Sequence, residues 1–391
     1  MLEQQNHSMV VAEAGDTPTA FRNCVPQLFL EDIYRTTIRI IKMRSACLID
    51  VALNLTDCVF HGVDWKGKRL HDDDFEHVLS RAASVGVETM IITGTSLAQS
   101  VKAVRLCRKY KERGLRCTVG VHPAHASEFS RPLVLSDVES FAEDESSVIT
   151  PKNNDASFSP EEEDANSTCR LEYLEKLIRD NKDVVVAVGE IGIDYAELSY
   201  CPRETQETYF IKQLDAFSRL GLPFLLHSRE CGDHFTRLLG EWMEKQPTDQ
   251  PPFCGVVHSF NGSPEEQRFL LEKGLFLSIN GSAFRERRLA EQVCQIPLDR
   301  LMFETDAPWC DIRNKDYGFQ YVKTQFPTTK KKKPLVMGTC LERRNEPCHM
   351  VQVVEVFTGC YNEFNKDKPI TQEAVMERVY HTTNSFFHLS P

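Results

Sequence analysis

The sequence predicts an α/β fold, a TIM-type (β/α)8 barrel that carries an N-terminal extension and an acidic disordered insertion. Three observations lead to this prediction. Short apolar runs rich in Val, Ile and Leu recur along the chain, segments with helical spacing lie between them, and several runs end in a histidine or a carboxylate. Eight such alternations within about 260 residues favour a closed barrel over an open doubly wound sheet.

Each apolar run is expected to be a strand covered on both faces, as in a parallel sheet. In chain order the runs are 46–54, 88–94, 116–121, 184–192, 223–228, 255–260, 275–281 and 301–306. Apolar spacing near 3.6 residues predicts helices between them and two more that close the far end. These helices are 72–85, 96–113, 203–220, 233–245, 264–273, 286–295, 346–361 and 371–387.

Local signals mark where several helices begin and end. Ser96 is an expected N-cap, and Ser263 followed by Pro264 has the order of an N-cap and a first helical position. Gly221 and Gly274 stand where a helix should stop before the next strand. The expected helix ends therefore fall between the expected strands.

The chain divides into an extension and one large domain. Residues 1–43 precede the first strand, and residues 44–391 form the predicted barrel. An acidic insertion is expected at about 143–167, because the stretch 137–164 holds ten acidic residues against one lysine and shows no periodicity. This stretch carries most of the net charge of −11.

Composition excludes several classes of protein. No apolar run approaches the roughly 18 residues of a membrane span. The first residues lack the basic and apolar regions of a secretory signal, so we expect a protein of the nucleus or cytoplasm that is not secreted. The 14 cysteines are scattered without a CxxC pair, and we interpret them as reduced thiols rather than disulfides or a zinc–cysteine site. Nothing indicates an obligate protein partner.

Four expected strands deliver a potential metal ligand at or just after their carboxyl ends. These residues are Glu190, His227, His258 and Asp306. The carboxyl ends of barrel strands meet at one mouth, so the four should converge there. Carboxylate and imidazole together suit one or two Mg²⁺ or Mn²⁺ ions, with Zn²⁺ also compatible. We expect Glu190 to bridge or anchor the metal and Asp306 to hold the ion and the attacking water, so these two carry the catalytic role.

Other residues are weaker candidates for substrate or supporting contacts. His122 ends the third strand, and Arg229 lies two residues after His227, where its guanidinium would reach a phosphate. Arg344 and Glu346 are expected to orient the site or clamp a backbone. Trp309 follows Ala-Pro after Asp306 and would stack on a base or plug the core.

A basic stretch follows the Asp306 motif. Between Asp311 and Arg344 nine basic residues face three acidic ones, a net charge of +6 that includes Lys330–Lys333. A solvated face, a phosphate-binding surface and a nuclear localisation signal all fit such a run.

The motifs together resemble the TatD family of metal-dependent deoxyribonucleases, in particular its eukaryotic TatD-domain subgroup. The resemblance runs from about Cys47 to Phe387 and is carried by LIDVALNLTD (48–57), TVGVHPAHASEF (118–129), VAVGEIGIDY (186–195), LLHSRE (225–230), VVHSFNG (256–262), ETDAPWC (304–310) and RRNEPCH (343–349). It implies the same four ligands. Where other members have histidines on the first strand, this chain has Asp50 and Asn54, as in the subgroup.

The predicted function is hydrolysis of DNA phosphodiester bonds by metal-activated water, with DNA as the substrate. Two alternatives stay open. One is a deacylase or amidohydrolase-like metal hydrolase on the same barrel, which the absence of His-x-His and of a bridging lysine on the fourth strand disfavours. The other is a binding protein that has lost catalysis, which the intact ligand set disfavours.

Overall fold

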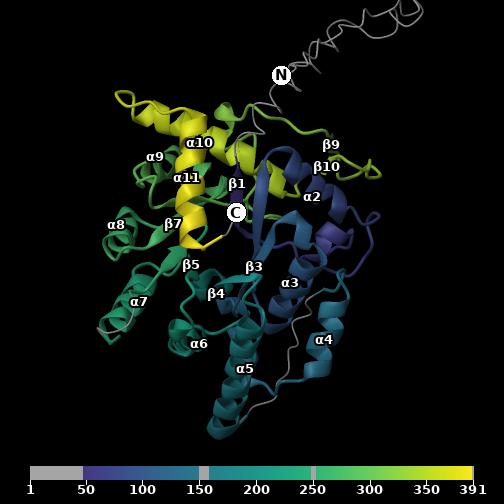
Figure 1. Cartoon of the computed structure of the whole chain (residues 1–391), viewed down its shortest axis with the longest axis vertical. Coiled ribbons are helices and arrows are strands. Elements are labelled where there is room, and N and C mark those ends of the chain that lie inside the picture. The colour runs from purple at the N-terminus through teal and green to yellow at the C-terminus, as the bar shows by residue number, and fades with distance from the viewer. Residues whose placement is uncertain (1–46, 149–157, 248–251, 390–391) are drawn as a thin grey trace, which may run out of the picture. The chain divides into compact units, whose positions relative to one another are not determined.

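The computed structural model describes residues 47–148, 158–247 and 252–389. Its centre is a sheet of eight parallel strands that hydrogen-bond in sequence order, with helices arranged around them (Figure 1). The strands are β1 (Leu48–Leu53), β2 (Val87–Ile92), β3 (Leu115–Val119), β4 (Val185–Asp194), β5 (Phe224–Arg229), β6 (Gly255–Val257), β7 (Phe276–Ile279) and β8 (Leu301–Phe303). The predicted barrel class is therefore confirmed.

The first and last strands meet through backbone bonds just beyond the end of β8. The amide of Asp306 donates to the Ala52 carbonyl at 2.9 Å, and the amide of Asn54 donates to the Ala307 carbonyl at 2.7 Å. These bonds fix the segment after β8 against β1, so Asp306 and Asn54 lie side by side at the carboxyl end of the barrel.

Every predicted helix is present, with shorter ends in most cases, and the structure adds two. The helices are α2 (Phe75–Ser84), α3 (Leu97–Lys109), α4 (Leu135–Glu143), α5 (Pro160–Asp180), α6 (Arg203–Phe217), α7 (His234–Glu244), α8 (Pro264–Glu272), α9 (Arg287–Val293), α10 (Met350–Phe364) and α11 (Gln372–Phe386). A small parallel pair, β9 (Thr328–Thr329) and β10 (Cys340–Leu341), lies in the long segment after β8.

The expectation of disorder across 143–167 is wrong for its last part, because α5 begins at Pro160. Ser159 caps this helix in a capping box with Glu162, and Glu161–Glu163 occupy the first turn. Acidic side chains stabilise a helix N-terminus through its macrodipole, so the same charges that suggested disorder favour the helix start. Residues 149–157 lie outside the described residues.

Two apolar clusters fill the unit. The larger joins the outer faces of the strands to the surrounding helices, and buried Phe75, Phe210, Phe235 and Phe357 belong to it. The smaller contains Ile91, Leu225, Val256 and Met302 from separate strands. It also takes in Phe386, Phe387 and Leu389 from the end of the chain. We interpret the smaller cluster as the barrel interior.

Residues 1–46 lie outside the described part of the chain, so the boundary between the extension and the barrel at 43/44 stays a prediction. Among the described helices, none combines the length and the apolar character needed to cross a membrane.

Candidate metal centre

Glu190 is presented by a stretch of β4 that requires glycine on both sides. Gly189 has φ of 143° and Gly192 has φ of 152°, a region that side chains rarely adopt. A Cβ at Gly189 would stand 2.4 Å from the Leu225 carbonyl oxygen, and one at Gly192 would stand 1.9 Å from that of His227. The two glycines therefore bring β4 against β5 and place Glu190 beside His227.

His227 and His258 owe their direction to the two-residue period of a strand. Leu225 and Val256 belong to the interior cluster, and the residue two positions later on a strand points to the same side. This rule directs His227 and His258 into the barrel at its carboxyl end. The side chains of Glu190 and His258 are 6% and 4% exposed, whereas that of His227 is 12% exposed.

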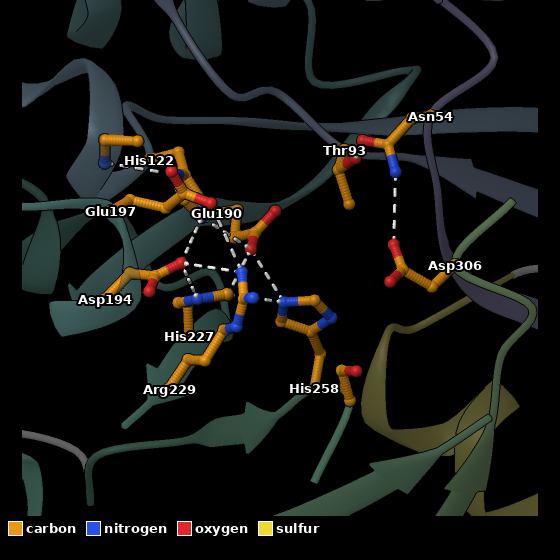
Figure 2. Close-up of polar contacts among 12 residues, drawn as sticks. Asn54, Thr93, His122, Glu190, Asp194, Glu197, His227, Arg229, His258 and Asp306 are labelled. Atoms are coloured by element: carbon orange, nitrogen blue, oxygen red, sulfur yellow. Dashed lines mark hydrogen bonds and ion pairs between the residues drawn. The ribbon is translucent and has the colours of Figure 1, made fainter. Parts of the chain in front are cut away.

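Three ligand atoms converge on one point (Figure 2). Glu190 Oε1 lies 2.6 Å from His227 Nδ1 and 2.7 Å from His258 Nε2, and the two nitrogens are 3.1 Å apart. Two ligands held at about 2.0–2.2 Å by one ion are about 3 Å apart, so the spacing fits one divalent cation. A divalent cation or a proton on one of the rings can occupy the space between these atoms, and the ligand spacing suits the cation.

The charges of the cluster reinforce this arrangement. Burial alone would raise the pKa of Glu190, but the imidazoles of His258 and His227 outweigh it and hold that pKa well below its usual value. Burial likewise works against the charged form of His258, yet Glu190 and Glu304 raise its pKa. Glu190 therefore stays ionised, and its negative charge attracts a positive charge at the centre.

Asp194 is a residue that sequence reasoning missed. Its Oδ2 lies 3.1 Å from His227 Nε2, so a proton on Nε2 leaves the Nδ1 lone pair aimed at the converging point. His122, Asp194 and His227 form a second candidate group. A neutral imidazole has one lone pair, so His227 serves only one group at a time.

His122 is brought to the centre as the sequence predicted, but as a hydrogen-bond donor. The amide of Ala124 donates to its Nδ1 at 3.1 Å, which leaves the proton of the neutral ring on Nε2. That Nε2 lies 3.5 Å from Glu190 Oε1 and 3.9 Å from Asp194 Oδ2. Burial lowers the pKa of His122 to about 3, so the ring is neutral.

Asp306 lies at the same end of the barrel, but its carboxylate is turned to other partners (Figure 2). Asn54 Nδ2 donates to Oδ1 at 3.1 Å, and the Cys310 thiol donates to Oδ2 at 3.2 Å. Its φ of 50° is in the left-handed region, which Asp tolerates better than most residues. Burial raises the pKa of Asp306 to about 7. Three of the four predicted ligands are thus in direct contact, with Asp306 beside them.

Glu304 is the second residue that sequence reasoning missed. It is fully buried and lies 3.5 Å from His258 Nδ1, a buried nitrogen that has no hydrogen-bond partner among the described residues. The signal was present, because Glu304 stands two residues after Met302, an interior residue of β8. Glu304 is placed to orient the ring of His258 from behind.

The first strand supports the segment that carries Asp306. Asp50 is completely buried and accepts hydrogen bonds from the Thr305 amide at 2.9 Å and hydroxyl at 2.6 Å. Asn54 accepts from the Thr93 hydroxyl at 2.6 Å, which turns its amide group toward Asp306. Asp50 and Asn54 therefore position the candidate site and do not join the three converging atoms.

Arg229 reaches the rim of the centre from the end of β5. Its Nη1 lies 3.6 Å from Asp194 Oδ2 and 3.5 Å from Glu197 Oε1. Its side chain is 47% exposed, so a phosphate can approach it from outside. The structure thus places Arg229 beside the centre, and its expected contact with a phosphate stays a prediction.

Arg344 and Glu346 are placed elsewhere. Arg344 donates to both carboxylate oxygens of Asp74, at 2.8 and 2.6 Å, and to Glu346 at 2.9 Å. Arg81 completes this buried network through Glu346 at 2.7 Å. No contact described for either residue reaches the three converging atoms. The two residues form a structural ion-pair network, and their expected role in orienting the site or clamping a backbone stays a prediction.

Trp309 lies on the surface rather than in the core. Its ring stacks on that of Trp65 with centroids 4.9 Å apart, and the two residues are 46% and 54% exposed. Trp65 also donates from Nε1 to Asp57 at 3.0 Å. Trp309 is three residues after Asp306 in sequence, and its stack with Trp65 forms an exposed aromatic surface.

The barrel and its convergent carboxylate and imidazoles define a hydrolase with a centre for a divalent cation. The family described as "TatD related DNase" matches residues 49–388, and the chain belongs to it. The protein named "Deoxyribonuclease Tat-D" of Schizosaccharomyces pombe is 35% identical over 347 residues, which cover 88% of this chain and 96% of that protein.

Other relatives and solved structures agree with this membership. The protein named "3'-5' ssDNA/RNA exonuclease TatD" of Cronobacter sakazakii is 31% identical, covering 79% of this chain and 88% of that protein. A TatD family hydrolase of Entamoeba histolytica superposes with a TM-score of 0.70 at 27% identity, covering 88% of this chain and 99% of that one. A Saccharomyces cerevisiae structure described as an uncharacterized amidohydrolase gives 0.72 at 28% identity, covering 87% and 99%.

Proposed function

We propose that the chain is a metal-dependent deoxyribonuclease that hydrolyses DNA phosphodiester bonds. The observation that carries the proposal is the convergence of Glu190 Oε1, His227 Nδ1 and His258 Nε2 within 3.1 Å of one another. Family membership supports the substrate class. Asp306, beside this cluster, is the proposed fourth ligand.

When bound, one or two divalent cations supply the Lewis acidity that activates water and offsets charge on the phosphate. The protein side chains do the rest. Asp194 and Glu304 hold the two histidine rings in the ligand orientation. His122 Nε2 and the guanidinium of Arg229 both lie near Asp194 Oδ2, and we propose that they hold phosphate oxygens.

The preferred cation is proposed to be Mg²⁺ or Mn²⁺. The centre offers oxygen ligands from Glu190 and Asp306 in addition to imidazole, and it has no cysteine among the three converging groups. Hard oxygen ligands favour Mg²⁺ and Mn²⁺ over softer ions, although nitrogen also suits Zn²⁺. We also propose that the protein acts in the nucleus or the cytoplasm.

The proposed substrate form is single-stranded DNA. The exposed Trp65–Trp309 stack offers a flat aromatic face near the Asp306 segment, and unpaired bases stack on such faces without regard to sequence. A bacterial relative is named a single-strand exonuclease. Paired bases in a duplex would have to separate before they reached this surface.

The test compares substrate classes on the purified chain. End-labelled single-stranded and double-stranded DNA are incubated with Mg²⁺ or Mn²⁺ beside acyl-ester and amide substrates. We expect cleavage of DNA, faster on single strands, and no acyl or amide hydrolysis above background. Amide or ester turnover that exceeds DNA cleavage would favour the amidohydrolase alternative, and no turnover with any substrate would favour a binding protein.

A further inference from the structure

A second group of potential metal ligands lies outside the centre described above. It consists of Cys340, Cys348 and His349, and one ligand atom from each lies within 4.8 Å of the others. Cys340 begins β10, and the other two precede α10. Both cysteines are almost completely buried, at 1% and 0% exposure, and His349 is partly buried.

The two sulfur atoms are spaced as zinc ligands. The Sγ atoms of Cys340 and Cys348 are 3.8 Å apart. Two thiolates at about 2.3 Å from a tetrahedral zinc ion are separated by about 3.8 Å, whereas a disulfide requires about 2.05 Å.

Asn345 holds the ring of His349 in an orientation that suits a metal ligand. Its Nδ1 lies 2.8 Å from Asn345 Oδ1, and the Glu346 amide nitrogen lies 3.2 Å from the same ring nitrogen. Asn345 Nδ2 donates to two carbonyl oxygens, so its Oδ1 is fixed as an acceptor, and the shorter contact favours a proton on His349 Nδ1. The proton on Nδ1 leaves the lone pair on Nε2, the usual state of a metal-bound histidine whose other nitrogen donates to a carbonyl oxygen.

The same asparagine ties this group to the catalytic segment. Asn345 Nδ2 donates to the carbonyl oxygens of Thr305 and Trp309, at 2.8 and 2.7 Å. These two carbonyls flank Asp306 in sequence. A cation that fixes His349 would therefore also fix Asn345 and, through it, the backbone that presents Asp306.

We propose that Cys340, Cys348 and His349 bind one thiophilic divalent cation, zinc above all, which braces the Thr305–Trp309 segment. The softness of two sulfur ligands separates this site from the oxygen-rich centre at Glu190. Three protein ligands leave a fourth position for water. The proposal does not depend on nuclease activity.

The first experiment uses Co²⁺ as the probe. Full-length protein is stripped with a chelator under reducing, oxygen-free conditions and titrated with Co²⁺ while near-ultraviolet absorption is recorded. Thiolate-to-cobalt absorption is expected in the wild type and is expected to fall at least tenfold in Cys340→Ser and in Cys348→Ser. His349→Cys keeps a three-ligand set and should retain the absorption.

Two cysteines elsewhere give matched controls. Cys107 is buried beside a second thiol, that of Cys117, and Cys310 contacts Asp306. Cys107→Ser and Cys310→Ser should leave the cobalt absorption unchanged. Absence of the absorption in the wild type, its survival in both test variants, or its disappearance in Cys310→Ser would overturn the proposal.

A second measurement avoids substitutions, in case the variants do not fold. X-ray absorption at the zinc edge is recorded on the wild-type chain after Zn²⁺ loading and removal of free metal. Sulfur neighbours at about 2.3 Å are expected. A zinc environment made only of nitrogen and oxygen would overturn the proposal.

Discussion

Glu190 is the residue on which the candidate centre depends, because one of its oxygens lies within hydrogen-bond distance of both His227 and His258. Its position follows from local chain geometry, since the two flanking glycines bring β4 within contact distance of β5. A larger residue at Gly192 would meet the His227 carbonyl oxygen. The position of the Glu190 side chain therefore depends on these two glycines.

Asp194→Asn should weaken metal binding without removing a proposed ligand. The carboxylate orients His227 through Nε2 at 3.1 Å, and removal of such a partner typically lowers metal affinity by about 10–100-fold. Metal titration of DNA cleavage measures the change. Asp183→Asn, at a surface pair with Arg108, is the control. Equal metal affinity in both variants would show that Asp194 does not orient the ring.

Arg344→Ala should destabilise the fold rather than act on substrate. The guanidinium stands between buried Asp74 and Glu346, and removal of one partner from a buried ion pair costs about 3–5 kcal/mol. Arg343→Ala, at the exposed neighbouring position, should change stability by about 0.5 kcal/mol or less. Chemical denaturation compares the two. If Arg344→Ala kept wild-type stability but bound DNA more weakly, the substrate clamp expected from sequence would be right.

The strand ends explain why some site residues were predictable from sequence. His227 and His258 follow apolar runs directly, and the two-residue period directs them inward with Leu225 and Val256. Glu304 follows the same rule from Met302, whereas Asp194 does not follow it from Ala187, because the strand register shifts between Val188 and Ile191. Acids near a strand end also occur as solvated or capping residues. Only the distances to the histidine rings distinguish them.

The segment after β8 carries Asp306 and Trp309 and gives a prediction about substrate binding. Trp309→Ala should raise KM for single-stranded DNA, because base–aromatic stacking contributes about 1–3 kcal/mol per base. Trp309→Phe retains a ring and should show a smaller increase. Steady-state kinetics on a single-stranded oligonucleotide measures both. Unchanged KM in Trp309→Ala and in Trp65→Ala would exclude the stack from substrate binding.

Helix α5 shows where sequence reasoning on elements was wrong. The acidic run suggested disorder through its charge, whereas the capping box of Ser159 and Glu162 indicated a helix start. Tertiary contacts also fix the helix, since Asn166 and Arg170 donate to backbone carbonyls of Ser130 and Arg131. Such contacts join segments far apart in sequence and are not visible in a local pattern.

The barrel as a whole was predictable because the strand signals and the helix signals in the sequence indicate the same fold. Apolar runs, helix caps and terminal glycines alternate with one period through the chain, and only a closed parallel sheet uses eight of them in order. The basic stretch was less predictable. Arg344 is buried in an ion-pair network and Lys330 pairs with Glu342 at 3.0 Å, so net charge alone overstated the surface available to DNA.

The exposed lysines of this stretch yield a prediction about long-range binding. Lys331→Gln with Lys332→Gln should weaken DNA binding and lower the slope of log K against log salt by roughly 0.7–0.9 for each phosphate that the variant no longer neutralises. Exposed Lys366 and Lys368, between α10 and α11, give a matched double variant. The bond cleaved should stay the same. An unchanged slope, with exclusion of the variant from nuclei, would favour a localisation signal.

The most direct test of the metal-dependent nuclease combines chelation with Glu190→Gln. The wild-type chain should cleave end-labelled DNA, stop in EDTA and recover with added Mg²⁺ or Mn²⁺. Glu190→Gln keeps the shape of the side chain but removes its charge, and we expect at least about a 100-fold loss, beyond the effect of a supporting partner. Glu175→Gln on α5, paired with Arg179 at the surface, is the control. Cleavage that persists in EDTA, or that Glu190→Gln retains in full, would contradict the account.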